Sequence, residues 1–169
     1  MWEVGKPAGL GAVVRQPHGP TLIGFAVIPD AVIQQLQCRS QQINQAEALA
    51  CLLGPHNWPE AFRNADVMHY VDNTSALSGC LKGGSGVEDS NPIFHLHALR
   101  LAELGTRYWV EWDESEANPA DEPSRLLAPG PVACSLNADF FELSLPDLPD
   151  LLGASLRDLA RPGLRASLD

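Results

Sequence analysis

The stretch that decides the fold spans residues 111–125 and reads EWDESEANPADEPSR. Residues 108–112, which overlap its start, are mostly aromatic or β-branched and predict a strand. The Asn-Pro pair at 118–119 interrupts that strand and opens the first turn of a helix, where proline is tolerated and an acidic side chain meets the positive end of the helix dipole. Asp121 therefore lies at a strand-to-helix junction, where a carboxylate is well placed to bind a metal ion.

A second carboxylate, Glu47, lies in a predicted helix. Residues 43–53 carry apolar side chains at 43, 46, 49, 50 and 53, and this spacing of three and four predicts an amphipathic helix that the Gly-Pro pair at 54–55 ends. Glu47 borders the apolar face of that helix. Taken alone, it is more readily interpreted as a solvated helix glutamate than as a site residue, because charged side chains are almost never buried without a partner.

A third carboxylate, Asp72, ends a short run with the character of a strand, residues 67–71, and a helix resumes at about Thr74. Two interpretations are equally favoured at this point. Asp72 is either the N-cap of the next helix or a ligand-binding residue, since α/β sheets bind ligands at the carboxyl ends of their strands.

Three fragments carry a resemblance to a known family: Asn44-x-x-Glu47, residues 70–77 (YVDNTSAL) and residues 118–125 (NPADEPSR). In this order they resemble ribonuclease H-like domains, especially those of reverse-transcribing retroelements. The resemblance covers roughly residues 5–128. It implies an α/β fold with a mixed central sheet flanked by helices.

The leading strands fit this expectation in part. Residues 10–14 and 21–28 predict two strands joined by a turn at 16–20, and the glycines that interrupt them, such as Gly9 and Gly11, mark a bulge or a close backbone approach. The family has one further strand before these two, and that strand carries an aspartate. Here residues 5–11 resemble the glycine-rich turn that follows it, but no Asp precedes them and Glu3 is the nearest acid.

Three explanations of that difference remain open: an N-terminally truncated domain, replacement of the aspartate by Glu3, or a degenerate site. We favour truncation.

The resemblance also implies the chemistry of the site. Two Mg²⁺ ions, or Mn²⁺ in their place, neutralise charge during hydrolysis of a phosphodiester, and carboxylates are their preferred ligands. By resemblance, Asp72 would bridge both ions, Glu47 would bind the ion near the leaving group, and Asp121 would bind the ion that activates water.

Binding of nucleic acid is implied for three further residues. Asn44 matches an asparagine that contacts the minor groove, and Asn73 and Thr74 lie where the family contacts the nucleic-acid backbone. The partners implied are an RNA–DNA hybrid and a reverse transcriptase domain of the same polyprotein.

Two functions follow as hypotheses. The first is a ribonuclease that hydrolyses the RNA strand of RNA–DNA hybrids. The second is a catalytically degenerate ribonuclease H-like module with a structural or nucleic-acid-binding role. An integrase or exonuclease of the same broad fold is disfavoured by the sequence around Asp121.

The charge balance bears on these hypotheses. The net charge of −10 argues against a strongly basic surface, which nucleic-acid binding normally uses. Part of the negative charge is concentrated in one segment, because residues 111–122 hold six acidic residues and no basic one. We interpret Asp113, Glu114 and Glu116 as a solvated acidic loop.

The remaining composition predicts one domain, residues 1–128, followed by a Pro/Leu-rich acidic extension at 129–169 that is partly ordered, with a short helix at 150–164. No apolar run approaches the ~18 residues that span a bilayer, and no leader pattern begins the chain, so we expect an intracellular protein, cytoplasmic or nuclear, without a membrane partner. The four cysteines lack a C-x-x-C pair and predict ordinary reduced thiols, not zinc ligands.

Overall fold

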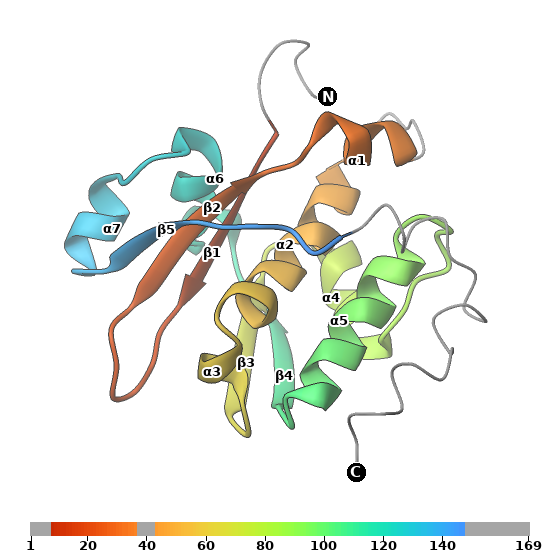
Figure 1. The fold of residues 1–169 in the computed structure, drawn as a ribbon, viewed down its shortest axis with the longest axis horizontal. Helices are drawn as coiled ribbons and strands as arrows, with labels where there is room; N and C mark the ends of the chain where they lie inside the picture. The colour runs from red at the N-terminus through yellow and green to blue at the C-terminus, as the bar shows by residue number, and fades with distance from the viewer. Residues whose placement is uncertain (1–7, 37–42, 148–169) are drawn as a thin grey trace.

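The computed structural model describes residues 8–36 and 43–147 (Figure 1). Strands and helices alternate along this part of the chain. In order, they are β1 (Gly9–Val14), β2 (Leu22–Val27), α1 (Asp30–Gln35), α2 (Ile43–Asn57), α3 (Pro59–Phe62), β3 (Asp66–Val71), α4 (Thr74–Lys82), α5 (Asn91–Glu103), β4 (Arg107–Trp112), the 3-10 helix η1 (Ser115–Ala117), α6 (Asp121–Leu126), α7 (Pro131–Ser135) and β5 (Asp139–Glu142).

The strands form a mixed three-stranded sheet and a parallel two-stranded sheet. In the first, β2 pairs with β1 antiparallel and with β5 parallel; in the second, β3 pairs with β4. Helices flank both sheets (Figure 1). The predicted α/β class with a mixed sheet and flanking helices is therefore confirmed. The strands that the structure describes do not join into one central sheet, because β1 and β3 are not hydrogen-bonded to each other.

The predicted hairpin is confirmed. β1 and β2 pair from Gly9 opposite Val27 to Val14 opposite Leu22, and residues 15–21 connect them. Alternation along β1 places Leu10 in the core and turns the glycines to the opposite face of the sheet.

The glycines of β1 permit α6 to pack directly on the strand. A Cβ atom added at Gly9 would lie 1.9 Å from the backbone oxygen of Ser124, and one added at Gly11 would lie 2.0 Å from the oxygen of Ala120. The close backbone approach predicted from these glycines is therefore present. It fixes the start of α6, and with it Asp121, against the sheet.

Helix α2 forms the centre of the core. Its buried side chains include Leu49, Leu52 and Leu53, which pack with residues of both sheets, such as Ala26 of β2 and Val71 of β3. The helix contacts β1, α4 and α5. Residues 8–36 and 43–147 contain no helix that could span a lipid bilayer.

The predicted end of α2 at residues 54–55 is wrong, because the helix continues to Asn57. Proline normally removes a hydrogen bond and crowds the preceding turn. Here Gly54 and Pro55 are buried, and the N–H of Trp58 still donates to the oxygen of Gly54 at 2.9 Å. The ring of Phe62 lies so close to Gly54 that an added Cβ would be 2.8 Å from it. Tertiary packing therefore outweighs the local tendency of Gly-Pro to end a helix.

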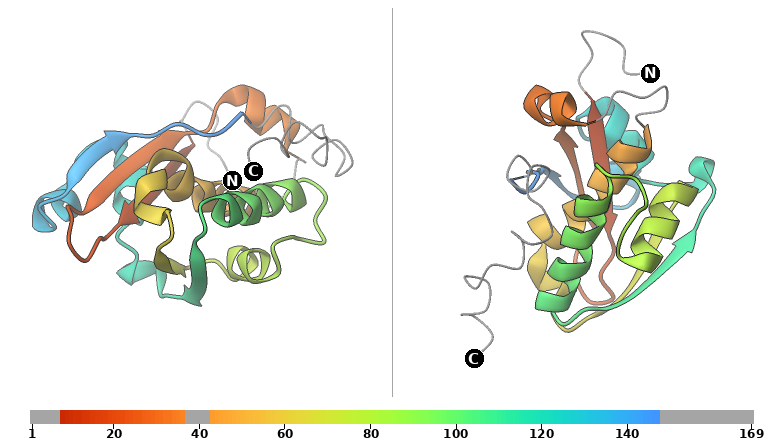
Figure 2. Two further views of the ribbon diagram at one scale, coloured as in Figure 1. Left: turned by 60° about the horizontal axis from the view of Figure 1, so that its bottom comes forward. Right: turned by 90° about the vertical axis from the view of Figure 1, so that its right-hand side faces the viewer.

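One face of the β3–β4 sheet packs on helices and the other is open. Val71 and Val110 are buried in the core, whereas Met68, Tyr70 and Trp109 are largely exposed. Figure 2 shows the helices gathered on one side of these two strands. Successive residues of a strand point to opposite faces, which explains the alternation.

The fold extends past residue 128. Glu122 of α6 accepts a hydrogen bond from the N–H of Val132 at 2.7 Å, at the start of α7. β5 then pairs with β2, and Leu143 after it is buried in the core. The first part of the predicted extension thus contributes a strand to the mixed sheet. The helix predicted at 150–164 lies outside the described residues.

The contact between β1 and α6 gives the first testable expectation. Gly11→Ala should lower the free energy of unfolding by about 1–3 kcal/mol, because its methyl group meets the Ala120 backbone, which cannot move without shifting α6. Urea unfolding followed by circular dichroism measures the change. Gly86→Ala is the matched control, since nothing lies within 4 Å of its added Cβ, and it should change the value by less than about 0.5 kcal/mol. Equal effects of the two substitutions would contradict this packing.

Candidate functional site

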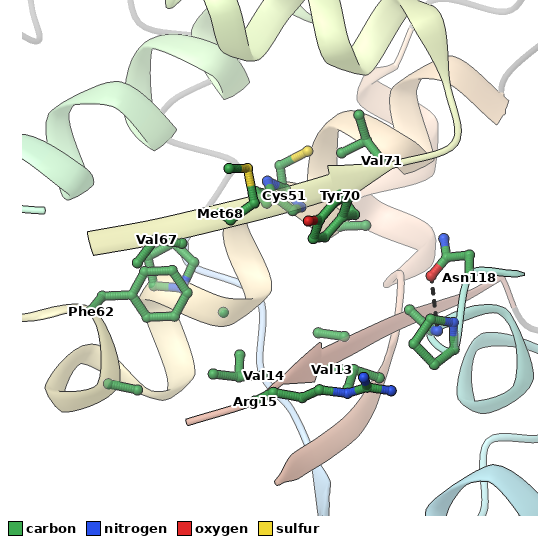
Figure 3. Close-up of a pocket in the computed structure, with 18 of the residues that line it drawn as sticks. Val13, Val14, Arg15, Cys51, Phe62, Val67, Met68, Tyr70, Val71 and Asn118 are labelled. Atoms are coloured by element: carbon green, nitrogen blue, oxygen red, sulfur yellow. Dashed lines mark hydrogen bonds between the residues drawn. The ribbon is translucent and has the colours of Figure 1, made fainter. Parts of the chain in front are cut away.

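A cavity of about 730 Å³ lies between β1 and β3 (Figure 3). Consecutive residues of both strands line it, 11–17 from β1 and its following turn and 65–72 from β3 and its flanks. A strand face would contribute every second residue, so the cavity is bounded by the two strand edges. These are the edges on which β1 and β3 lack a strand partner within the described part of the chain.

Helix α2 forms a third wall of the cavity. Glu47, Ala50, Cys51 and Gly54 line it, and their spacing of three and four residues places them along one stripe of the helix. Residues 117–120 line it as well. Figure 3 shows Asn118 and Val71 at one end of the cavity and Phe62 and Val67 at the other.

Asp72 follows the last residue of β3 and lines the cavity. The cap of α4 is its neighbour Asn73, whose Oδ1 accepts hydrogen bonds from the N–H groups of Ser75 and Ala76 at 2.9 and 3.0 Å. Of the two interpretations of Asp72, the N-cap is therefore wrong. No hydrogen bond or ion pair to the Asp72 carboxylate occurs among the residues that the structure describes. Its oxygens remain available for a ligand.

The negative charge of Glu47 is disfavoured by its surroundings. Burial, followed by the nearby carboxylates of Asp72 and Asp121, raises the pKa of Glu47 from 4.5 to about 7. The interpretation of Glu47 taken alone, as a solvated helix glutamate, is wrong, because the helix places Glu47 at the cavity and near two other acids. Carboxylates that repel one another in a partly buried place are stabilised by a cation.

Asp121 is the first residue of α6 and lies directly after the residues that line the cavity. The turn before it is closed by Asn118, whose Oδ1 accepts from the N–H of Ala120 at 3.0 Å. Arg125 donates to the Asp121 carboxylate at 2.8 Å. This partly exposed pair leaves one carboxylate oxygen without a partner inside the described ranges.

Asp113 was missed by sequence reasoning, which placed it in a solvated loop. It follows β4 directly, its N–H donates to the oxygen of Val71 at 3.0 Å, and it lines the cavity. A signal for Asp113 was present in the sequence, because β3 and β4 are each followed directly by an aspartate. The carboxyl ends of neighbouring parallel strands meet at one edge of the sheet, so the two aspartates lie near each other.

The residues predicted to bind nucleic acid lie beside the acids. Nδ2 of Asn73 donates to Oδ1 of Asn44 at 2.8 Å, so the side chain that caps α4 also contacts the start of α2. Thr74, the first residue of α4, is exposed. The structure thus brings Asn44, Asn73 and Thr74 together beside Asp72, although none of the three lines the cavity.

The donor set suits a hard divalent cation. Carboxylates from α2, from the end of β3 and from the start of α6 are within electrostatic reach of one another. Oxygen ligands with excess negative charge are those that Mg²⁺ prefers. Comparisons with protein-family models, with curated proteins and with solved structures found no match to this chain.

The raised pKa of Glu47 gives a second expectation. The folded state binds the Glu47 proton more tightly than the unfolded state, so this contribution to stability is complete below pH 4.5 and is lost as the pH rises through about 7. In chelator, Glu47→Gln should therefore gain stability over the natural chain between those pH values, by at most about 3 kcal/mol above pH 7. Urea unfolding of both proteins from pH 4 to pH 8 measures the difference.

Millimolar Mg²⁺ provides the internal control for this measurement. A bound cation neutralises the three acids, so the difference between the two proteins above pH 7 should shrink when Mg²⁺ replaces the chelator. A difference that is the same at pH 4 and at pH 8 would show that Glu47 is not held among other acids.

Proposed function

We propose that this chain is a ribonuclease H-type nuclease that hydrolyses the RNA strand of RNA–DNA hybrids with the help of Mg²⁺. The observation that carries the proposal is the meeting of Glu47, Asp72 and Asp121 from three separate elements beside one cavity. Their order along the chain and the sequence around each resemble the acids of ribonuclease H-like domains. Metal-assisted hydrolysis needs such a set of oxygen ligands on rigid elements.

The same proposal assigns a role to each acid. Bound Mg²⁺, or Mn²⁺ in its place, supplies charge neutralisation at the attacking and leaving oxygens. Asp72 would bridge two ions, Glu47 would bind on the side of the leaving group, and Asp121 would bind on the side of the attacking water. The absence of hydrogen-bond partners at Asp72 within the described residues supports its role.

The fold implied by this proposal is ribonuclease H-like, with one more strand than the structure describes. In that fold a strand would lie between β1 and β3, join the two sheets and carry a further aspartate. The cavity supports this, because it is bounded by two open strand edges. A strand placed there would satisfy the backbone groups of both edges.

Hybrid binding would use few side chains, since the geometry of an RNA-containing duplex and its 2′-hydroxyls are recognised more than its base sequence. Asn44, Asn73 and Thr74 are the residues that we assign to this contact. Their place beside Asp72 would hold the scissile phosphate near the acids. The partner domain in this proposal is a reverse transcriptase of the same retroelement polyprotein, acting inside the cell.

One observation favours a second function, a degenerate module that keeps the fold for a structural or nucleic-acid-binding role. Within residues 8–36 and 43–147, no strand and no further aspartate occupy the space between β1 and β3, where the additional aspartate would stand. With three acids in place of four, both metal binding and catalysis would be weaker.

A cleavage assay decides between the two functions. A labelled RNA–DNA hybrid is incubated with the chain and Mg²⁺, and cleavage of the RNA strand is followed on a denaturing gel. Asp72→Asn should lower the rate at least about 100-fold, because a metal ion at this place is worth several kcal/mol to the transition state. Glu114→Gln, which alters an exposed acid after β4, is the matched control and should keep the rate.

The assay has a clear negative outcome. If the chain shows no cleavage that depends on Asp72 but still binds the hybrid, the degenerate module is established. If the folded chain neither cleaves nor binds the hybrid, the family assignment is overturned.

A further inference from the structure

A cluster of two thiols and an imidazole lies in the core beneath the β3–β4 sheet. Cys51 comes from α2, Cys80 from α4 and His69 from β3. Cys51 and Cys80 are buried, and His69 is half-buried. The two Sγ atoms are 3.6 Å apart, and one nitrogen of His69 lies within 4.8 Å of both. Residues 29 apart in sequence thus present soft ligand atoms to one point.

The geometry points to a Zn²⁺ site formed by Cys51, Cys80 and His69. In a tetrahedral zinc site with Zn–S bonds of about 2.3 Å, two sulfurs lie about 3.8 Å apart. The observed separation of 3.6 Å is close to that value, so an ion can enter with little movement of the helices. Both sulfurs are free thiols in the structure.

The surroundings of His69 support this assignment. Its Nδ1 lies 2.5 Å from the hydroxyl oxygen of Tyr108, which leaves Nε2 for the metal. Metal-bound histidines are usually held in this way, by a second group that fixes the ring and its tautomer. The ring of His97, buried nearby, packs edge-on against Tyr108 with a centroid distance of 5.1 Å and holds the tyrosine in place.

The fourth position of the ion is accessible. Cys51 and His69 both line the cavity between β1 and β3, so water from the cavity can complete a tetrahedron. Three protein ligands and one water are the arrangement of open zinc sites, whereas closed structural sites use four protein ligands.

The thiol site, formed by Cys51, Cys80 and His69, differs in its ligand atoms from the acidic site, formed by Glu47, Asp72 and Asp121. Thiolate and imidazole ligands select Zn²⁺ and similar soft ions, while Mg²⁺ is bound by oxygen ligands. Cys51 lies one helical turn after Glu47, and its Sγ donates to the Glu47 backbone oxygen at 3.3 Å. The two sites are therefore neighbours along α2, yet they bind different ions and do not depend on each other.

Co²⁺ is a direct probe of the thiol site, because thiolate-bound Co²⁺ absorbs strongly by charge transfer and tetrahedral Co²⁺ absorbs in the visible range. The full chain, reduced and freed of metal by a chelator, is titrated with Co²⁺ and then with Zn²⁺. We expect charge-transfer absorption that saturates at one ion per chain and disappears when Zn²⁺ displaces Co²⁺. Excess Mg²⁺ should leave it unchanged.

Five variants make the test specific. Cys51→Ser and Cys80→Ser should each abolish the charge-transfer band, and Cys134→Ser, which alters an exposed thiol outside the cluster, should keep it. His69→Gln keeps both sulfurs and should weaken Zn²⁺ binding at least 10-fold, so the site can be tested even where a cysteine variant fails to fold. Asp72→Asn should keep the charge-transfer band of the natural chain, whether or not the proposed nuclease activity exists.

Three results would overturn the site. The first is the absence of a thiolate band in the folded, reduced chain. The second is a band that persists in Cys51→Ser and Cys80→Ser. The third is an affinity for Zn²⁺ that His69→Gln leaves unaltered.

Discussion

The packing of α2 between the two sheets is the constraint on which the rest of the structure depends. β1 and β3 share no backbone hydrogen bond in the described ranges, so side-chain packing joins the sheets. The buried leucines of α2 supply it, and each fully buried leucine contributes about 1.5–3 kcal/mol relative to an exposed one. The same helix places Glu47 and Cys51 along the cavity. Any shift of α2 would therefore move the sheets and the candidate site together.

The packing of α2 explains why Glu47, Asp72 and Asp121 lie close together although their charges repel one another. Charge at Glu47 is opposed by burial and by two neighbouring carboxylates, so the apolar packing of α2 holds the acid in a place that it would otherwise avoid. Perturbed acids of this kind concentrate at functional sites because folding for stability alone would not select them. The glycines of β1 add to the constraint, since they let α6 approach and keep Asp121 near the other two.

Local sequence patterns were sufficient for elements whose signals lie within a few residues. The hairpin of β1 and β2, the strand before Asp72 and the start of α6 follow from alternation, turn residues and an Asn-Pro pair. Features set by distant parts of the chain could not be predicted in this way. Phe62 packing on Gly54 carries α2 past its expected end, and the pairing of β4 with β3 brings Asp113 to the cavity. β5 joins the sheet although its segment has the composition of a linker.

The meeting of Cys51 and Cys80 could not be predicted from the sequence either. Zinc ligands are recognised in a sequence by short spacings, but Cys51 and Cys80 lie on two different helices and meet only because α2 and α4 cover the same face of one sheet. One turn of α2 separates Glu47, the oxygen ligand of the proposed Mg²⁺ site, from Cys51, the sulfur ligand of the proposed Zn²⁺ site. Ligand chemistry would keep the two ions apart, because Mg²⁺ does not compete for thiolates and the thiol cluster is buried below the strand whose end carries Asp72. The two proposed sites can therefore share α2 and still bind different ions.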